Sequence, residues 1–108
     1  MEKLQTYEKY LAKLPFTGEV PAIIDFYAPW CGPCQMLAPR LELLAHQYHG
    51  RLKVFKVDVD KYPEFSTAAG IRSVPTLFFV NKNGDFDRVS GALSFSHMKT
   101  RVEDILKQ

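Results

Sequence analysis

The chain has 108 residues, of which 46% are hydrophobic and 24% charged, and its formal net charge at pH 7 is +2. This length accommodates one domain, expected over residues 1–108, and the apolar content excludes a chain that is disordered throughout. The sequence contains no basic block of the kind that marks a nucleic-acid site. It also contains no apolar run that reaches the ~18 residues of a membrane span.

The first predicted element is a helix over residues 3–14, because Leu4, Tyr7, Leu11 and Leu14 recur at helical spacing. The same segment is charged from its start and lacks the apolar centre of a signal peptide. We therefore expect a cytoplasmic protein, or a periplasmic or exported one whose signal has already been removed.

A central strand and a second helix follow. Residues 20–27 are β-branched, aromatic and apolar on both faces apart from Asp25, which predicts a strand covered on both sides. The apolar positions between residues 37 and 48 again have helical spacing, and Gly50 is a suitable stop for that helix. This order places the segment 28–36 at a handover from strand to helix.

The second half of the chain completes an α/β pattern. Its predicted elements are a strand over 52–59, a helix over 62–69, a strand over 74–80, a turn over 81–84, a strand over 85–90 and a helix over 95–106. Asn83-Gly84 predicts a hairpin turn with positive φ at both residues. The order α-β-α-β-α-β-β-α predicts a central mixed sheet flanked by helices.

The sequence contains two cysteines, Cys31 and Cys34. A disulfide that closes so short a loop stabilises a fold by about 2 kcal/mol, less than a bridge over a longer loop. The pair is therefore better suited to reversible redox chemistry than to holding the fold together.

The predicted start of the second helix suggests different roles for the two thiols. Pro33 fits the first turn of a helix, which places Cys31 at or just before the helix start. The free N–H groups and the dipole there lower the pKa of the Cys31 thiol below that of an ordinary cysteine. Cys34, one turn further on, is expected to be more buried. We predict that Cys31 attacks a target disulfide and that Cys34 resolves the mixed disulfide.

The residues around the pair carry a recognisable motif. They read Asp25-Phe26-Tyr27-Ala28-Pro29-Trp30-Cys31-Gly32-Pro33-Cys34, followed by Met36-Leu37-Ala38-Pro39. This motif resembles the active-site region of the thioredoxin family, and the resemblance extends over roughly residues 20–107. It implies the thioredoxin fold, a βαβαββα core that the N-terminal helix precedes here. It also implies that the protein reduces disulfides in target proteins by dithiol–disulfide exchange.

The resemblance assigns further roles to individual residues. It implies that Asp25 is a buried carboxylate beneath Cys34 that accepts and donates its proton, and that Lys56 tunes Asp25. An acid among apolar strand residues is expected to have a raised pKa because burial disfavours its charge. The resemblance also implies a cis peptide bond at Val74-Pro75, and redox tuning by Gly32 and Pro33.

An apolar docking surface for target proteins is implied as well. Its expected members are Trp30, Gly32, Pro33, Val74, Pro75, Gly91 and Ala92. The sequence departs from the family at Tyr27, where tryptophan is more frequent, and at Gln35, where lysine is common. The first departure changes the packing near the site, and the second removes a positive charge beside Cys34.

Three alternatives remain open at this point. Cys31, Cys34, His46 and His49 have a spacing that superficially resembles a zinc site, although residues 34–46 are predicted to form one helix about 18 Å long. A non-catalytic binding subunit would use the apolar surface around Trp30. An oxidant or isomerase of exported proteins would use the same cysteines in the opposite direction.

The preferred interpretation is a protein-disulfide reductase, because Gly32-Pro33 is typical of the reducing members of the family. The implied partners are disulfide-containing target proteins and a reductase of the thioredoxin-reductase type. That enzyme would supply electrons from NADPH, so no prosthetic group is expected in this chain. We expect a monomer that binds neither nucleic acid nor membrane.

Overall fold

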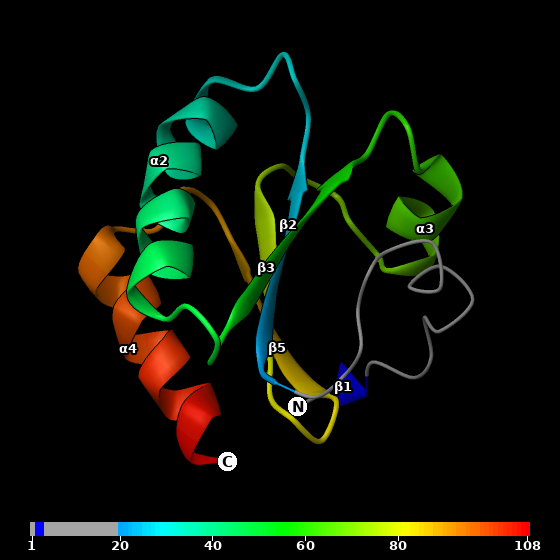
Figure 1. Ribbon diagram of the computed structural model, residues 1–108. Helices are drawn as coiled ribbons and strands as arrows, with labels where there is room; N and C mark the ends of the chain where they lie inside the picture. Colours follow the sequence, from blue (N-terminus) through cyan, green and yellow to red (C-terminus); the bar gives the residue numbers. More distant parts are fainter. Residues whose placement is uncertain (1, 4–19) are drawn as a thin grey trace.

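The computed structural model of the chain describes residues 2–3 and 20–108 (Figure 1). Most of the helix predicted over residues 3–14 lies outside these residues. Where the segment is described, Glu2–Lys3 forms a short strand, β1, that pairs antiparallel with β5 (Asp85–Ser90). The expectation of helix at Lys3 is therefore wrong. A strand this short depends on its partner across the sheet, which helical spacing in the sequence does not reveal.

The predicted mixed sheet is confirmed. Its five strands lie in the order β1-β5-β4-β2-β3. β2 (Ala22–Tyr27) is parallel to β3 (Lys53–Asp58) and antiparallel to β4 (Thr76–Val80), which in turn pairs antiparallel with β5. The parallel pair needs a long crossover, and α2 (Gly32–Gln47) supplies it.

Helices cover both faces of the sheet, as Figure 1 shows. α2 and α4 (Phe95–Lys107) pack on one face, and α3 (Pro63–Ala68) packs on the other. Period-two alternation along β2 divides its side chains between the two layers. Ile23 packs with the α2 and α4 layer, whereas Ile24 packs with the α3 layer. This alternation places Asp25 on the same face as Ile23.

The predicted faces of the long helices are confirmed. The apolar positions of α2 that are buried under the sheet are Leu37, Leu41, Leu44 and, just beyond its end, Tyr48. On α4 the buried positions are Met98, Val102 and Ile105. Full burial of each such side chain stabilises the fold by about 1.5–3 kcal/mol, so these stripes fix both helices against the sheet. No helix in the described part of the chain combines the length and apolar character needed to cross a bilayer.

The hairpin between β4 and β5 forms as predicted, but by a different turn. Among the described residues positive φ values occur at glycines alone, so Asn83 does not have the expected positive φ. Gly84 has φ +83° and donates its N–H to the Asn81 carbonyl oxygen at 3.0 Å. Asn81 Oδ1 also accepts from the N–H groups of Asn83 and Asp85. The Asn81 side chain thus stabilises a turn in which one glycine supplies the left-handed residue.

Candidate active site

Cys31 and Cys34 form a disulfide at the start of α2, with their Cα atoms 5.2 Å apart. The exposed fractions of the two residues are 4% and 5%. The expectation that Cys34 is the more buried is therefore wrong for this oxidised form. Both cysteine side chains belong to one apolar cluster with Ala28. Tyr27 and Val74 pack against this cluster and shield both cysteines from solvent.

The two sulfurs differ in their hydrogen bonding rather than in their burial. Cys31 is the N-cap residue of α2, with extended backbone, and its Sγ accepts the backbone N–H of Cys34 at 3.2 Å. Pro33 lies in the first turn, where the absence of an N–H costs no helical hydrogen bond. A sulfur in this position faces a backbone donor and the positive end of the helix dipole, and both stabilise a thiolate.

The loop that precedes β4 meets the cysteine pair, and the residue that follows β5 hydrogen-bonds to that loop. The Val74–Pro75 peptide bond is cis, as the resemblance implied, and the Val74 carbonyl oxygen lies 3.6 Å from Cys31 Sγ. Gly91, with φ +98°, donates its N–H to the Pro75 carbonyl oxygen at 2.9 Å. Because proline has no N–H, backbone pairing by an extended segment at this loop would rely on Val74.

Asp25 is a buried carboxylate, with an exposed fraction of 1%. Its Oδ1 atom has no hydrogen-bond partner among the described residues. Burial raises the pKa of the carboxyl group from 3.8 to about 6, an effect that the positive charge of Lys56 opposes. Lys56 is the register partner of Asp25 across the β2–β3 pair. The expectation that Asp25 is a buried carboxylate is therefore confirmed.

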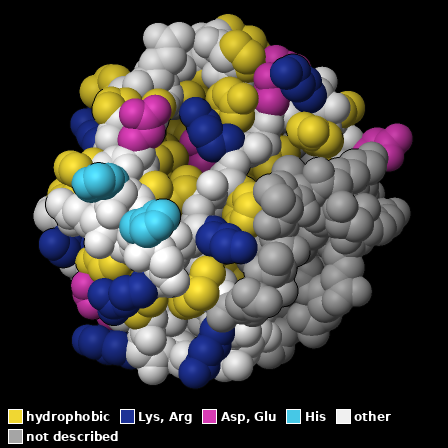
Figure 2. Space-filling model, in the orientation of Figure 1, with side chains coloured by type: hydrophobic (Ala, Val, Ile, Leu, Met, Phe, Trp, Pro, Cys, Tyr) yellow, Lys and Arg dark blue, Asp and Glu magenta, His cyan; other side chains and the backbone are white. Residues whose placement is uncertain are grey.

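The side chain of Trp30 is exposed beside the disulfide. Its exposed fraction is 71%, and its indole N–H donates to Asp60 Oδ2 at 3.0 Å. Gly32 and Pro33 are also exposed, whereas Val74, Gly91 and Ala92 are half-buried and Pro75 is buried. Figure 2 shows hydrophobic side chains at the upper end of the molecule, where the segment between β2 and α2 lies in Figure 1.

Comparison with known proteins identifies this arrangement. The sequence pattern of the family described as thioredoxin matches residues 2–104. The chain belongs to the thioredoxin family. It is accordingly a thiol–disulfide oxidoreductase of the protein-disulfide reductase type, and the Cys31–Cys34 disulfide is its redox-active pair.

Individual relatives support this assignment. The chain is 42% identical over 86 residues to thioredoxin 1 of Nostoc sp., a match that covers 80% of each protein. It is 41% identical over 91 residues to a chloroplastic M-type thioredoxin of Pisum sativum, covering 84% of this chain but 53% of that longer protein. The crystal structure of a chloroplastic thioredoxin z superposes with a TM-score of 0.81 at 32% identity, covering 99% of this chain and 93% of the other. The predicted thioredoxin fold is therefore confirmed.

The zinc alternative is not supported by the geometry of this thioredoxin. Cys34 and His46 lie on the same continuous helix, and twelve residues at 1.5 Å each separate them by about 18 Å. His46 and His49 are exposed. Within residues 2–3 and 20–108, no three His, Cys, Asp or Glu side chains are grouped so that they could hold a metal ion.

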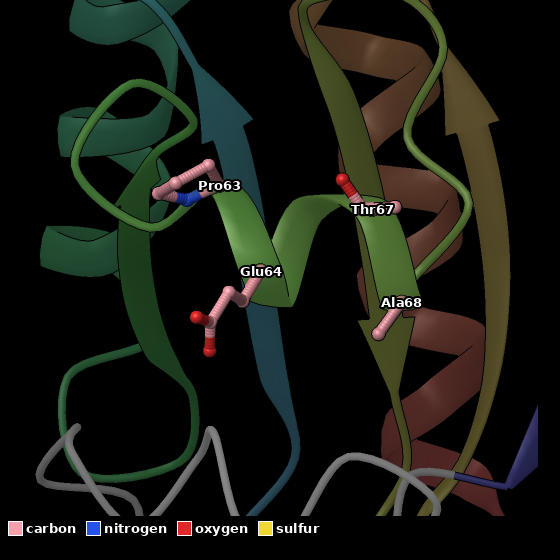
Figure 3. A pocket seen from close by; sticks show the side chains of 4 residues that line it. All are labelled: Pro63, Glu64, Thr67 and Ala68. Carbon is pink, nitrogen blue, oxygen red and sulfur yellow. The ribbon is translucent and has the colours of Figure 1, made fainter.

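A hollow on α3 is separate from the redox site. It is lined by Pro63, Glu64, Thr67 and Ala68, which Figure 3 shows on successive turns of that short helix. Its lining includes one titratable group, the Glu64 carboxylate, and no sulfur. It therefore adds nothing to the chemistry of the cysteine pair.

Three contacts of the site were not predicted from the sequence. They are the Trp30–Asp60 hydrogen bond, a hydrogen bond from Arg40 to the Leu93 carbonyl oxygen at 2.7 Å, and the approach of Lys56 Nζ to within 4.6 Å of the Tyr27 ring centroid. The Arg40 bond joins α2 to the loop that follows Ala92. A fourth contact that was not predicted lies at the other departure from the family, where Gln35 Nε2 donates to the Pro29 carbonyl oxygen at 3.2 Å. Each contact joins side chains to partners that no sequence motif indicates.

Proposed function

We propose that the chain reduces disulfides in other proteins, with Cys31 as the attacking residue and Cys34 as the resolving residue. The Cys31 thiolate attacks one sulfur of the target disulfide, and the other target sulfur leaves as a thiol. Cys34 then attacks Cys31 Sγ and releases the second target thiol. Two electrons pass to the target, and the Cys31–Cys34 disulfide remains. The observation that carries the role assignment is that Cys31 Sγ caps α2 and accepts the Cys34 N–H.

Asp25 is the proton acceptor for Cys34 in this proposal, and Lys56 tunes it. The carboxyl group is buried, lies on the α2-facing side of β2, and has a pKa raised to about 6, so it exchanges protons close to neutral pH. An acid with an ordinary pKa would be too weak a base for this task. Gly32 and Pro33, between the cysteines, tune the redox properties of the pair.

Target proteins dock on the surface formed by Trp30, Gly32, Pro33, Val74, Pro75, Gly91 and Ala92 in this proposal. The exposed indole of Trp30 and the Val74 backbone beside Cys31 support this role. An extended target segment would pair with the Val74 backbone, and its apolar side chains would contact Trp30.

Replacing Trp30 with alanine is therefore expected to raise KM for a protein disulfide by about 10- to 30-fold, since an exposed aromatic residue is a frequent binding hot spot. The rate with a small aromatic disulfide should stay unchanged, because that substrate needs no docking surface. The matched control is Leu43→Ala, which removes an exposed apolar side chain from the other end of α2. Equal effects of the two substitutions on KM would reject the docking role of Trp30.

The reduction potential of the pair tests the direction of the reaction. We expect a value more negative than the roughly −180 mV of protein disulfide isomerase, because a reductase must give electrons to its targets. The measurement is equilibration with glutathione redox buffers, followed by quantification of the oxidised and reduced forms. A potential near the roughly −120 mV of a strong periplasmic oxidant would instead establish the oxidant or isomerase alternative.

The proposal extends to partners and compartment. The oxidised protein is recycled by a thioredoxin-reductase-like enzyme that draws on NADPH, while thioredoxins themselves need no bound cofactor. We propose one domain over residues 1–108, supported by the family match to residues 2–104, and a monomer whose docking surface stays free. A reductase requires a reducing compartment, for which we propose the cytoplasm. The chloroplastic relatives make a plastid the alternative, which cell fractionation distinguishes.

A further inference from the structure

The Lys56 side chain is exposed, and its ammonium group lies beside an aromatic ring. Its Nζ atom lies 4.6 Å from the centroid of the Tyr27 ring, within the range in which a cation is attracted to an aromatic face. An exposed lysine otherwise samples many rotamers in water. The ring of Tyr27 therefore selects one direction for the Lys56 ammonium group.

Tyr27 and Asp25 lie on the same face of β2, two residues apart. Asp25 is in register with Lys56, and Tyr27 is in register with Asp58, the residue that ends β3. Tyr27 also packs against the apolar cluster that contains Cys31 and Cys34. One aromatic side chain thus contacts both the apolar cluster that contains the redox pair and the cation next in register to the buried acid.

Among the described residues, the other groups on the strands beside Asp25 do not duplicate the positive charge of Lys56. The titratable groups on the strands beside Asp25 are Tyr27 from β2 and Lys56 and Asp58 from β3, whereas Cys34 of α2 is held in the disulfide. β4 contributes the apolar Leu77 opposite Asp25, and the buried residues of α4 are apolar. Asp58 is itself held by the backbone N–H of Asp60, which donates to its Oδ1 at 2.9 Å. Among the groups named here, Lys56 is therefore the one that carries a positive charge.

We propose that Tyr27 is a positioning residue that holds the Lys56 ammonium group on the Asp25 side of the sheet and so sets the pH range in which Asp25 changes its charge. This inference rests on the proposed acid–base role of Asp25. It assigns a purpose to Tyr27, the residue at which the chain departs from the more frequent tryptophan. The position needs an aromatic face, and the tyrosine hydroxyl is dispensable.

The test is a pH titration of the Asp25 carboxyl group in the oxidised protein. The NMR chemical shift of its carboxyl carbon reports the midpoint. Lys56→Met should move the midpoint to higher pH, because it removes the charge that favours the carboxylate. Tyr27→Leu should move the midpoint in the same direction by a few tenths of a pH unit. Loss of an exposed cation–π contact lowers the population of the Lys56 ammonium position beside residue 27 about two- to fivefold. Tyr27→Phe should restore the original midpoint.

The double variant separates positioning from a general packing effect. If Tyr27 acts through Lys56, adding Tyr27→Leu to Lys56→Met should cause no further shift. A shift of the same size in both backgrounds would overturn the proposal, as would an unchanged midpoint in Tyr27→Leu. A shift to lower pH would also overturn it, since that result means that the smaller side chain merely admits water to Asp25.

The experiment remains decisive if Tyr27→Leu does not fold. Incorporation of 3,4,5-trifluorophenylalanine at position 27 keeps the ring shape but weakens its attraction for a cation, and it should shift the midpoint in the same direction as Lys56→Met. The titration uses no target protein, so its outcome does not depend on whether Asp25 transfers a proton during catalysis. A normal rate of product release after Asp25→Asn would reject the proposed acid–base role of Asp25 while leaving the positioning of Lys56 intact.

Discussion

Replacing Cys34 with serine should leave the protein covalently attached to the target proteins that it attacks. Cys31 keeps its place as the N-cap of α2, so the first exchange proceeds and forms a mixed disulfide. Serine cannot attack Cys31 Sγ, and the second exchange therefore stops. Multiple turnover with a protein disulfide should fall to the level of the reaction without enzyme. Non-reducing gel electrophoresis would detect the trapped species, and dithiothreitol should release it.

Cys31→Ser is the matched control, because it removes the other sulfur from the same helix start. It should trap no targets, because the remaining thiol of Cys34 lies in the first turn of α2 rather than at its N-cap. Equal trapping by the two variants would reject the assignment of different roles to the two cysteines. Absence of covalent adducts from both would favour the alternative of a non-catalytic binding subunit.

Replacing Asp25 with asparagine should stabilise the protein by up to about 3 kcal/mol at pH 7. The carboxyl group has a pKa of about 6 in the folded protein, against 3.8 for an exposed one, because its charged form is buried. The folded state therefore binds more protons between these values, so the free energy of unfolding falls as the pH rises from about 4 to about 6. A shift of this size corresponds to about 3 kcal/mol. Asparagine carries no charge, so the free energy of unfolding of the variant does not fall in this way as the pH rises.

Urea unfolding of the oxidised protein at several pH values would measure this effect. The difference between Asp25→Asn and the original protein should be small below pH 4, grow through pH 5 and stay constant above pH 7. Asp104→Asn removes an exposed carboxylate from α4 and should change the stability by less than about 0.5 kcal/mol. A gain in stability that does not vary with pH would contradict the proposed cause.

The same Asp25→Asn variant should release reduced product more slowly near neutral pH. Asparagine cannot accept the proton of the Cys34 thiol, and positioned acid–base groups contribute about 10²–10⁴-fold to such steps. Rapid-mixing measurements of mixed-disulfide breakdown would isolate this step from the initial attack by Cys31. The deficit should shrink at high pH, where Cys34 loses its proton to solvent without help.

Much of the fold follows from local sequence patterns. Helical spacing of apolar residues predicted the buried faces of α2 and α4 because a helix repeats its faces every 3.6 residues. The apolar run around Asp25 predicted a strand covered on both sides, and the family resemblance implied that Asp25 itself is buried, as it is. The motif from Trp30 to Cys34 identified the redox pair, since the two cysteines lie close along the chain and Pro33 favours a helix start between them.

Other features depend on partners that are distant in the sequence. The two-residue strand β1 exists through its pairing with β5, and the turn at Asn81 is determined by three hydrogen bonds to that one side chain and its carbonyl group. The equal burial of Cys31 and Cys34 results from the cover that Val74 and Tyr27 provide. Their positions along the helix alone had suggested that Cys34 is more buried than Cys31.

The sequence by itself determined most of the elements and the redox pair, and its resemblance to the family implied the burial of Asp25, because spacing, composition and motif act over a few consecutive residues. Only the tertiary structure decided which groups surround them. It placed Lys56 against the Tyr27 ring, Asp60 against the Trp30 indole and Val74 against Cys31 Sγ. These neighbours come from different strands and loops, and their meeting depends on sheet order and register, which are properties of the whole packed chain.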